Sequence, residues 1–232
     1  MPDAMRVPGR ALLCAMLALS VCGVSLAADD VSVRVNVGRR SMLLPAGYTA
    51  TGERLEARNS SVGVKDVERV LTSITTPAGR RLVLLLQAVD AAGLFQWDFK
   101  CSRLKSDELQ FVYSPVHSMR DECVVVVGPV ELAGVLQEVV PELKASQALL
   151  DEAAVGYLVR AQYAAQTGSM LSALVFVPEP FSGAVPGGKR PANDSGLPDE
   201  VVAWALNLGR EVQAGVRSFS GDWQLPPINE KE

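Results

Sequence analysis

The residues best suited to chemistry gather in one stretch, at positions 114–122. Ser114, His117 and Asp121 supply a hydroxyl, the single histidine of the chain and a carboxylate. A serine becomes a nucleophile when a histidine takes its proton and a carboxylate orients the imidazole ring. His117, Ser114 and Asp121 are therefore candidate catalytic residues of a hydrolase. A solvated loop explains the same residues, because neighbours on one loop rarely converge in a pocket and the chain has no G-x-S-x-G elbow.

Two cysteines, Cys101 and Cys123, bracket this stretch. An even cysteine count in a chain exported from the cytoplasm predicts a structural disulfide between them. A metal site of Cys101, His117 and Cys123 is the alternative, but its cysteine-to-histidine gap is longer than zinc sites use. A redox pair is disfavoured because Cys-x-x-Cys is absent. We expect no metal and no cofactor.

A glycine-rich loop at residues 183–189 fits the phosphate-loop pattern G-x-x-x-x-G-K. Such a loop needs backbone N–H donors, a following helix, and a Ser or Thr hydroxyl for magnesium. Here Arg190 replaces the hydroxyl, Pro191 follows at once, and Pro186 removes a donor. We reject a nucleotide site, and the glycines and prolines predict a plain loop.

Residues 1–28 form a targeting segment. Arg6 and Arg10 precede an apolar run, which ends in small residues before two aspartates. This order is typical of a secretory signal peptide, with cleavage after Ala27 or Ala28. The alternatives are an uncleaved membrane anchor and a lipid anchor on Cys22. Each of these interpretations places the remainder of the chain outside the cytoplasm.

Composition bounds the class of protein. The 232 residues are 48% apolar, which supports a folded core and excludes general disorder. A net charge of -4 without a long basic run argues against a nucleic-acid binder. One histidine excludes sites that need two or more, such as a three-histidine zinc centre.

The elements that must position these residues follow from the apolar pattern. Alternating or continuous apolar runs predict strands at residues 31–37, 42–44, 81–89, 94–100, 109–113, 124–127 and 171–177. Apolar residues at helical spacing predict helices at residues 64–74, 129–139, 146–166 and 198–212. The strands between 81 and 127 suggest an antiparallel meander. The aromatic residues Phe95, Trp97 and Phe99 fall on one face of a predicted strand and belong to the core.

The predicted fold class is α+β: an antiparallel sheet of about five strands with three or four helices packed on one face. The domain plan is a signal peptide at 1–28, one domain at 29–220 and a flexible tail at 221–232. Missing catalytic signatures favour a secreted or periplasmic, non-enzymatic binding or assembly protein of the cell envelope. Its partner is then another envelope protein or a small ligand, with no membrane span after signal cleavage and no nucleic acid. The alternative is an extracytoplasmic hydrolase that uses His117 with Ser114 or a nearby carboxylate.

Overall fold

Ten β-strands and two helices make up the regular structure of the described residues. The computed structural model describes residues 33–58, 67–90, 101, 108–115, 121–139, 154–165, 168–181 and 192–228. All of these lie within one compact unit, Val31–Glu232. Of the helices described, neither is long and apolar enough to cross a bilayer.

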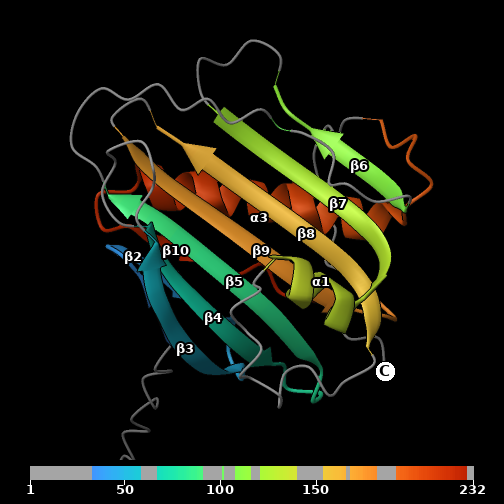
Figure 1. Ribbon diagram of the computed structural model, residues 1–232, viewed down its shortest axis with the longest axis horizontal. Helices are drawn as coiled ribbons and strands as arrows, with labels where there is room; N and C mark the ends of the chain where they lie inside the picture. The colour runs from blue at the N-terminus through green and yellow to red at the C-terminus, as the bar shows by residue number, and fades with distance from the viewer. Residues whose placement is uncertain are drawn as a thin grey trace, which may run out of the picture. The chain divides into compact units, whose positions relative to one another are not determined.

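Seven strands form a large antiparallel sheet (Figure 1). In spatial order they are β3 (Thr49–Arg58), β4 (Val67–Thr75), β5 (Arg81–Asp90), β9 (Ser169–Pro178), β8 (Val155–Ala164), β7 (Asp121–Glu131) and β6 (Leu109–Tyr113). A small sheet contains β1 (Arg34–Val37), β2 (Arg40–Leu43) and β10 (Asp222–Gln224), in the order β1-β2-β10. In the small sheet β1 and β2 are antiparallel, whereas β10 runs parallel to β2.

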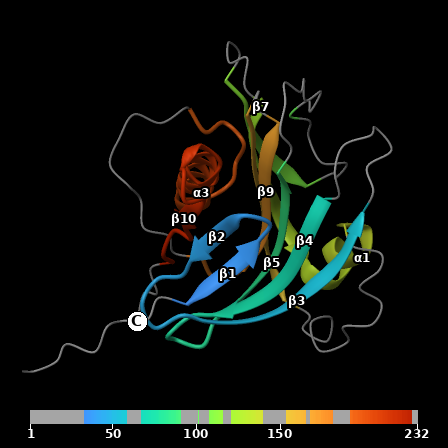
Figure 2. The same cartoon turned by 90° about the vertical axis from the view of Figure 1, so that its left-hand side faces the viewer.

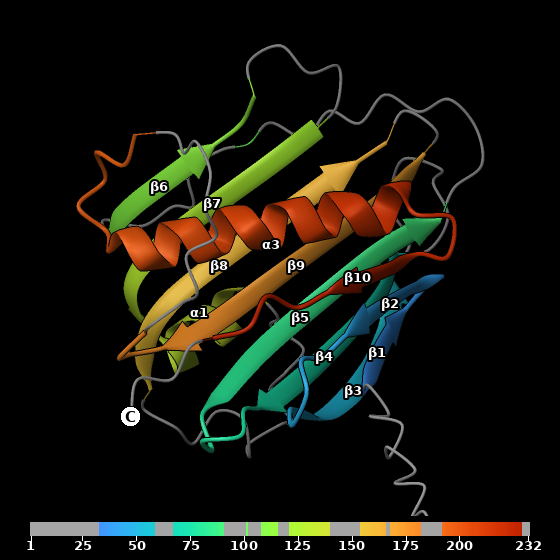
Figure 3. The ribbon, with the colours of Figure 1, turned by 180° about the vertical axis from the view of Figure 1, so that it is seen from behind.

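The two helices lie on opposite faces of the large sheet. Helix α3 (Asp199–Arg217) packs on one face together with the small sheet (Figure 3). Helix α1 (Leu132–Val139) packs on the other face, where Leu132 joins a cluster with Leu71, Val83 and Phe176. Figure 2 shows the large sheet edge-on between α1 and α3. We name the two sides the α3 face and the α1 face.

The predicted fold class is wrong. The described structure is mostly β, with a three-stranded and a seven-stranded sheet, and its two helices do not share a face. The meander is also wrong in part, because the neighbours of β5 in the sheet are β4 and β9. Among the described strands between residues 81 and 127, β6 and β7 do pair as consecutive neighbours.

Two predicted helices are strands. Residues 64–74 contribute to β4, and residues 146–166 contribute to β8. Each strand is buried on both faces over most of its length, so its apolar residues do not alternate and imitate a helical pattern. In β8, Tyr157, Leu158 and Ala161 belonged to the predicted helical stripe, but tertiary packing overrides such local propensity.

Two further segments also differ from prediction. Gly128 and Pro129 do not open a helix but lie in β7, at a shift of register between Val127 and Val130, and α1 begins at Leu132. Residues 49–58, where the sequence gave no clear signal, form the edge strand β3.

The segment from 221 onward is not a loose tail as far as residue 228. Trp223 is buried in β10, and the Trp204 Nε1–H donates to the Pro226 carbonyl at 3.1 Å. The Tyr48 hydroxyl receives a hydrogen bond from the Ile228 N–H at 3.0 Å. The predicted tail therefore packs on α3 and the small sheet, because Trp223, Leu225 and Ile228 bury apolar surface there.

Several predictions are confirmed. Strands occupy the predicted positions 81–89, 109–113, 124–127 and 171–177, and the last helix begins at Asp199 after Pro198. The predicted inner stripe of that helix is buried throughout, at Val201, Trp204, Ala205, Leu208 and Val212. The predicted strand at 94–100 and the loop at 183–189 lie outside the described residues, as do residues 1–28.

Candidate functional site

Two of the three predicted catalytic residues, Ser114 and Asp121, lie at one end of the large sheet, where β6 ends and β7 begins. Ser114 is exposed just beyond β6, and Asp121 is the first residue of β7. The pairing of Tyr113 with Val124 brings these two strand ends side by side. His117 lies outside the described residues, so the assembly of Ser114, His117 and Asp121 into a triad stays a prediction.

The predicted disulfide is present. Cys101 and Cys123 are bonded, with their Cα atoms 5.3 Å apart. Cys123 lies on β7 on the α1 face, where it clusters with Val125 and Val127. The bridge therefore ties Cys101 to the sheet beside the end that carries Ser114 and Asp121.

A second polar cluster lies under the C-terminal half of α3. Glu122 accepts a hydrogen bond from Gln213 Nε2 at 3.3 Å, and Arg217 Nε donates to the Tyr163 hydroxyl at 3.0 Å. The guanidinium of Arg217 also lies over the Tyr163 ring, 5.4 Å from its centroid. Burial raises the pKa of Glu122, and the Arg210 charge partly opposes that rise. These partners satisfy one another and link α3 to β7 and β8, which is a structural role.

A tyrosine–carboxylate pair lies at the opposite end of β8. The Tyr157 hydroxyl donates to Glu179 Oε1 at 2.6 Å. Burial, with the hydrogen bond and charge of Glu179, raises the pKa of Tyr157 to about 12, so this phenol keeps its proton at neutral pH. Over the part of the chain that the structure describes, no group of three or more His, Cys, Asp and Glu side chains is placed to hold a metal ion.

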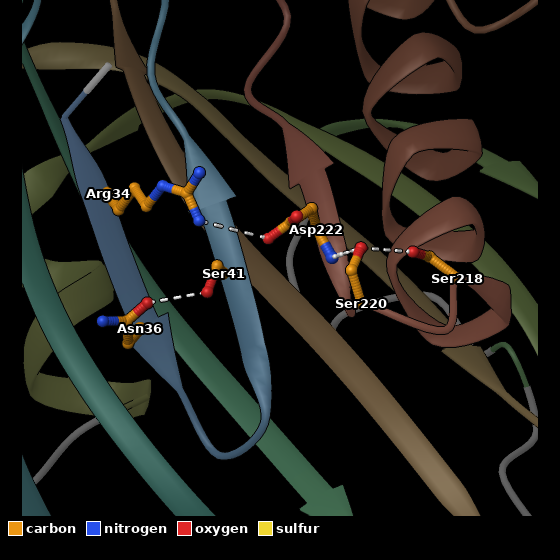
Figure 4. A network of polar contacts seen from close by, with 6 residues as sticks. All are labelled: Arg34, Asn36, Ser41, Ser218, Ser220 and Asp222. Atoms are coloured by element: carbon orange, nitrogen blue, oxygen red, sulfur yellow. Dashed lines mark hydrogen bonds and ion pairs between the residues drawn. The ribbon is translucent and has the colours of Figure 1, made fainter. Parts of the chain in front are cut away.

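Polar contacts also cover the outer surface of the small sheet (Figure 4). The Ser218 and Ser220 hydroxyls lie 2.9 Å apart and brace the turn between α3 and β10. Arg34 and Asp222 pair across 3.7 Å with side chains that are 55% and 35% exposed, and ion pairs that are open to solvent contribute little. This surface is a solvated sheet face whose hydrogen bonds fix a turn.

The feature least expected of a sheet interior is a row of polar side chains across the α1 face. Directly opposed positions on four neighbouring strands carry Arg69 on β4, Gln87 on β5, Ser172 on β9 and Gln162 on β8. Arg160 lies two residues before Gln162 on the same face of β8. We name these five residues the polar patch.

Apolar side chains flank the polar patch on the same face. The adjacent row of side chains holds Leu71 on β4, Leu85 on β5 and Leu174 on β9. Arg160 of β8 lies directly opposite Leu174 in the same row. The next row holds Val83, Phe176 and Leu158. Leu71, Val83 and Leu85 belong to the cluster that α1 caps through Leu132. The polar patch therefore borders an apolar surface that is at least two rows of side chains wide.

Burial differs along the polar patch. Arg69 and Ser172 are 4% and 5% exposed, whereas Gln87, Arg160 and Gln162 are half-buried, as is Leu174. Solvent thus reaches the sheet at its centre, where β5, β9 and β8 run together. Burial lowers the pKa of Arg160, although a guanidinium remains charged at neutral pH.

The polar patch combines guanidinium and amide N–H donors with one hydroxyl, and all of these groups can hydrogen-bond a ligand. A few polar groups set in an apolar wall are typical of small-ligand sites.

Sequence reasoning missed the polar patch because it assigned the wrong elements. Arg69 fell on the outer side of a predicted helix, and Arg160 and Gln162 fell within another. The usable signal was the pattern from 157 to 163, in which Tyr157, Val159 and Tyr163 alternate with Leu158, Arg160 and Gln162.

Comparison with known proteins identifies no relative of this chain. No family model matches the chain, and neither the curated proteins nor the solved structures contain a significant match. The fold and the geometry of the polar patch therefore carry the functional interpretation.

Proposed function

We propose that this chain is a non-enzymatic binding protein that acts outside the cytoplasm and holds a small ligand on the α1 face. The observation that carries the proposal is the polar patch. Its five hydrogen-bonding side chains lie next to an apolar surface at the centre of the large sheet. A few hydrogen-bonding side chains grouped on an otherwise apolar face are the kind of groups that orient a small ligand, which supports the proposal.

Two features support a location outside the cytoplasm. The Cys101–Cys123 disulfide fits an oxidising compartment such as the periplasm. The proposed signal peptide at residues 1–28 supplies the route there. With cleavage after Ala27 or Ala28, the mature protein begins shortly before β1.

The test is native mass spectrometry of the protein purified from its own envelope. We expect the wild-type chain to carry an added small-molecule mass. Leu174→Trp fills the centre of the α1 face and should remove that mass, because Leu174 is half-buried beside Arg160. Leu109→Trp makes the same change at an exposed site on β6 and should retain it.

Two outcomes would overturn the proposal. One is a wild-type protein without any added mass, or a mass that Leu174→Trp retains. The other is a hydrolytic activity that His117→Ala abolishes while the melting temperature stays unchanged, which would establish the catalytic alternative.

A further inference from the structure

We propose that Phe219, on the turn between α3 and β10, inserts into the surface of an anionic lipid bilayer while Arg39 and Arg217 bind the lipid head groups. This inference does not depend on the polar patch and adds a second interaction surface. It follows from three properties of the turn at residues 218–221: the exposure of its aromatic ring, the hydrogen bonds that hold its backbone, and the charge around it.

Phe219 is the most exposed large apolar side chain of the described residues. Its relative exposure is 110%, whereas Val33, Leu109 and Val155 reach 38%, 49% and 42%. The whole ring therefore lies in water and contributes nothing to the core. Since a singly exposed apolar side chain is ordinary on a protein surface, the backbone and the charges around Phe219 must carry the argument.

Hydrogen bonds hold the backbone on both sides of the ring. The Gly221 N–H donates to the Ser218 carbonyl at 3.3 Å, and the Ser218 and Ser220 hydroxyls lie 2.9 Å apart (Figure 4). Gly221 also binds the β1–β2 hairpin, because its carbonyl accepts the Ser41 N–H at 3.2 Å. The turn thus presents Phe219 from a fixed backbone, which lowers the entropic cost of binding.

Two of the four arginines near the turn are already neutralised. Arg34 of β1 pairs with Asp222 at 3.7 Å. Arg40 of β2 pairs with Asp90 at 3.1 Å. The remaining two arginines therefore determine the charge that a partner would meet at the turn.

Arg39 and Arg217 keep their full positive charge. Arg217 is exposed two residues before Phe219, and its Nε donates to the uncharged Tyr163 hydroxyl. Arg39 is exposed on the hairpin, and its carbonyl oxygen would lie 2.4 Å from a Cβ atom at Gly221. Within the described part of the chain, neither guanidinium forms an ion pair. Chain geometry places both backbones within about 13 Å of Phe219.

A bilayer fits this arrangement better than a protein pocket does. Stable protein interfaces have a contiguous apolar core, whereas Phe219 is flanked by the polar Ser218 and Ser220. Association with a membrane surface needs an apolar side chain at the acyl boundary and cations among anionic head groups. Phe219 supplies the first, and Arg39 and Arg217 supply the second. One ring and two charges give weak, reversible association.

Partition onto lipid vesicles, measured by co-sedimentation, tests the inference. Vesicles of phosphatidylcholine are neutral, and vesicles with equal parts of phosphatidylcholine and phosphatidylglycerol are anionic. At physiological ionic strength, screening beyond about 8 Å limits repulsion by the net charge of -4 of the whole chain. We expect at least fivefold stronger partition onto the anionic vesicles, because each arginine at the surface gains from their charge.

Phe219→Ser removes the ring from a position that supports no packing. We expect it to weaken partition onto anionic vesicles about 10- to 100-fold, the effect of losing one buried aromatic side chain, and to leave the melting temperature unchanged. Val155→Thr is the matched control, because it removes an exposed apolar side chain at the start of β8 and should leave partition unchanged.

Arg39→Gln tests the charge separately from the ring. We expect it to weaken partition onto anionic vesicles about fivefold and to leave partition onto neutral vesicles unchanged. Arg54→Gln is its control, since it removes an exposed charge that already pairs with Glu68 on the large sheet. This control should partition as the wild type does.

Phe219→Trp reports the depth of the ring directly. Vesicles whose acyl chains carry bromine should quench the fluorescence of this variant more than that of the wild type. The native Trp204 and Trp223 are only 0% and 2% exposed, so both stay out of reach of the quencher. Equal quenching of the variant and the wild type would show that position 219 does not enter the bilayer.

Three further results would overturn the inference. They are an absence of partition onto either kind of vesicle, equal partition onto both kinds, and equal partition of Phe219→Ser and the wild type. If the wild type binds no vesicle but captures one envelope protein that Phe219→Ser fails to capture, the turn serves a protein partner instead of a bilayer. None of these results bears on the α1 face, whose test is the added small-molecule mass.

Discussion

At the scale of single residues, one ion pair joins the two sheets. Asp90, the last residue of β5, lies 3.1 Å from Arg40 of β2 and accepts the Arg39 backbone N–H at 2.9 Å. The side chains of Arg40 and Asp90 are only 10% and 19% exposed, so water screens this pair weakly. The pair therefore fixes the position of the β1–β2 hairpin against the large sheet.

Removing one charge of this pair should destabilise the protein. We expect Asp90→Asn to lower the free energy of unfolding by about 1–3 kcal/mol, because the Arg40 guanidinium stays buried without its counter-charge. The matched control is Arg54→Gln, which breaks an exposed pair with Glu68 at 3.9 Å and should change stability by less than about 0.5 kcal/mol. Urea unfolding of both variants measures the difference, and equal effects would contradict this account.

The ionisation of Glu122 should lower the stability of the folded protein as the pH rises. Burial raises its pKa in the folded state, so folding favours the protonated carboxyl and the ionised form is a destabilising one. That penalty is present above the raised folded pKa and disappears as the pH falls below the ordinary value of 4.5. Arg210 reduces the penalty, because its positive charge favours the ionised form.

We therefore expect Glu122→Gln to stabilise the protein at neutral pH, by less than about 1 kcal/mol because the group is only partly buried. The advantage should vanish near pH 4, which thermal unfolding across pH can measure. A Glu122→Gln protein that is less stable at pH 7 would show that the Arg210 attraction outweighs burial.

Residue chemistry alone predicted one part of the site region. The Cys101–Cys123 bridge followed from an even cysteine count, because it needs no knowledge of the fold. The polar patch could not be predicted, since Arg69, Gln87 and Ser172 are far apart in sequence and meet only through strand pairing.

At the scale of elements, helix α3 approaches the large sheet unusually closely at one glycine. A Cβ atom at Gly209 would lie 2.6 Å from Cγ2 of Val124 on β7, which is far inside van der Waals contact. A glycine in mid-helix disfavours the helix by about 1 kcal/mol relative to alanine, so its presence here reflects packing rather than propensity. Gly134 of α1 has open space around the equivalent position.

The same substitution should therefore have opposite effects in the two helices. We expect Gly209→Ala to destabilise the protein by about 1–3 kcal/mol through overpacking against β7. Gly134→Ala should be neutral or stabilise it by up to about 1 kcal/mol, because it improves helix propensity without a clash. Thermal unfolding of both variants provides the comparison, and a stabilising Gly209→Ala would contradict the close packing of α3 on Val124.

The elements that the sequence predicted well are those with a single strong signal. Helix α3 has charged residues in its first turn and one apolar stripe, and in β9 the run from 171 to 177 is apolar except for Ser172. The failures, β4 and β8, are strands buried on both faces, for which neither a period of two nor a period of 3.6 is distinctive.

At the scale of the folded unit, one sheet separates two different environments. Its α3 face is covered by a long helix, the small sheet and the segment up to residue 228, which bury a large apolar core. Its α1 face carries the polar patch beside a row of leucines, Leu71, Leu85 and Leu174. Local patterns could not reveal this division, because it depends on strand order β3-β4-β5-β9-β8-β7-β6.

The most direct test of the binding site compares methyl NMR spectra of the protein as isolated from its envelope and after ligand removal on a hydrophobic resin. The account predicts that the largest shifts fall on Leu71, Leu85 and Leu174 of the α1 face. Leu84 and Leu206, which belong to the α3-face core, should stay unchanged. Shifts confined to the α3-face leucines, or identical spectra from the two preparations, would contradict a ligand site at the polar patch.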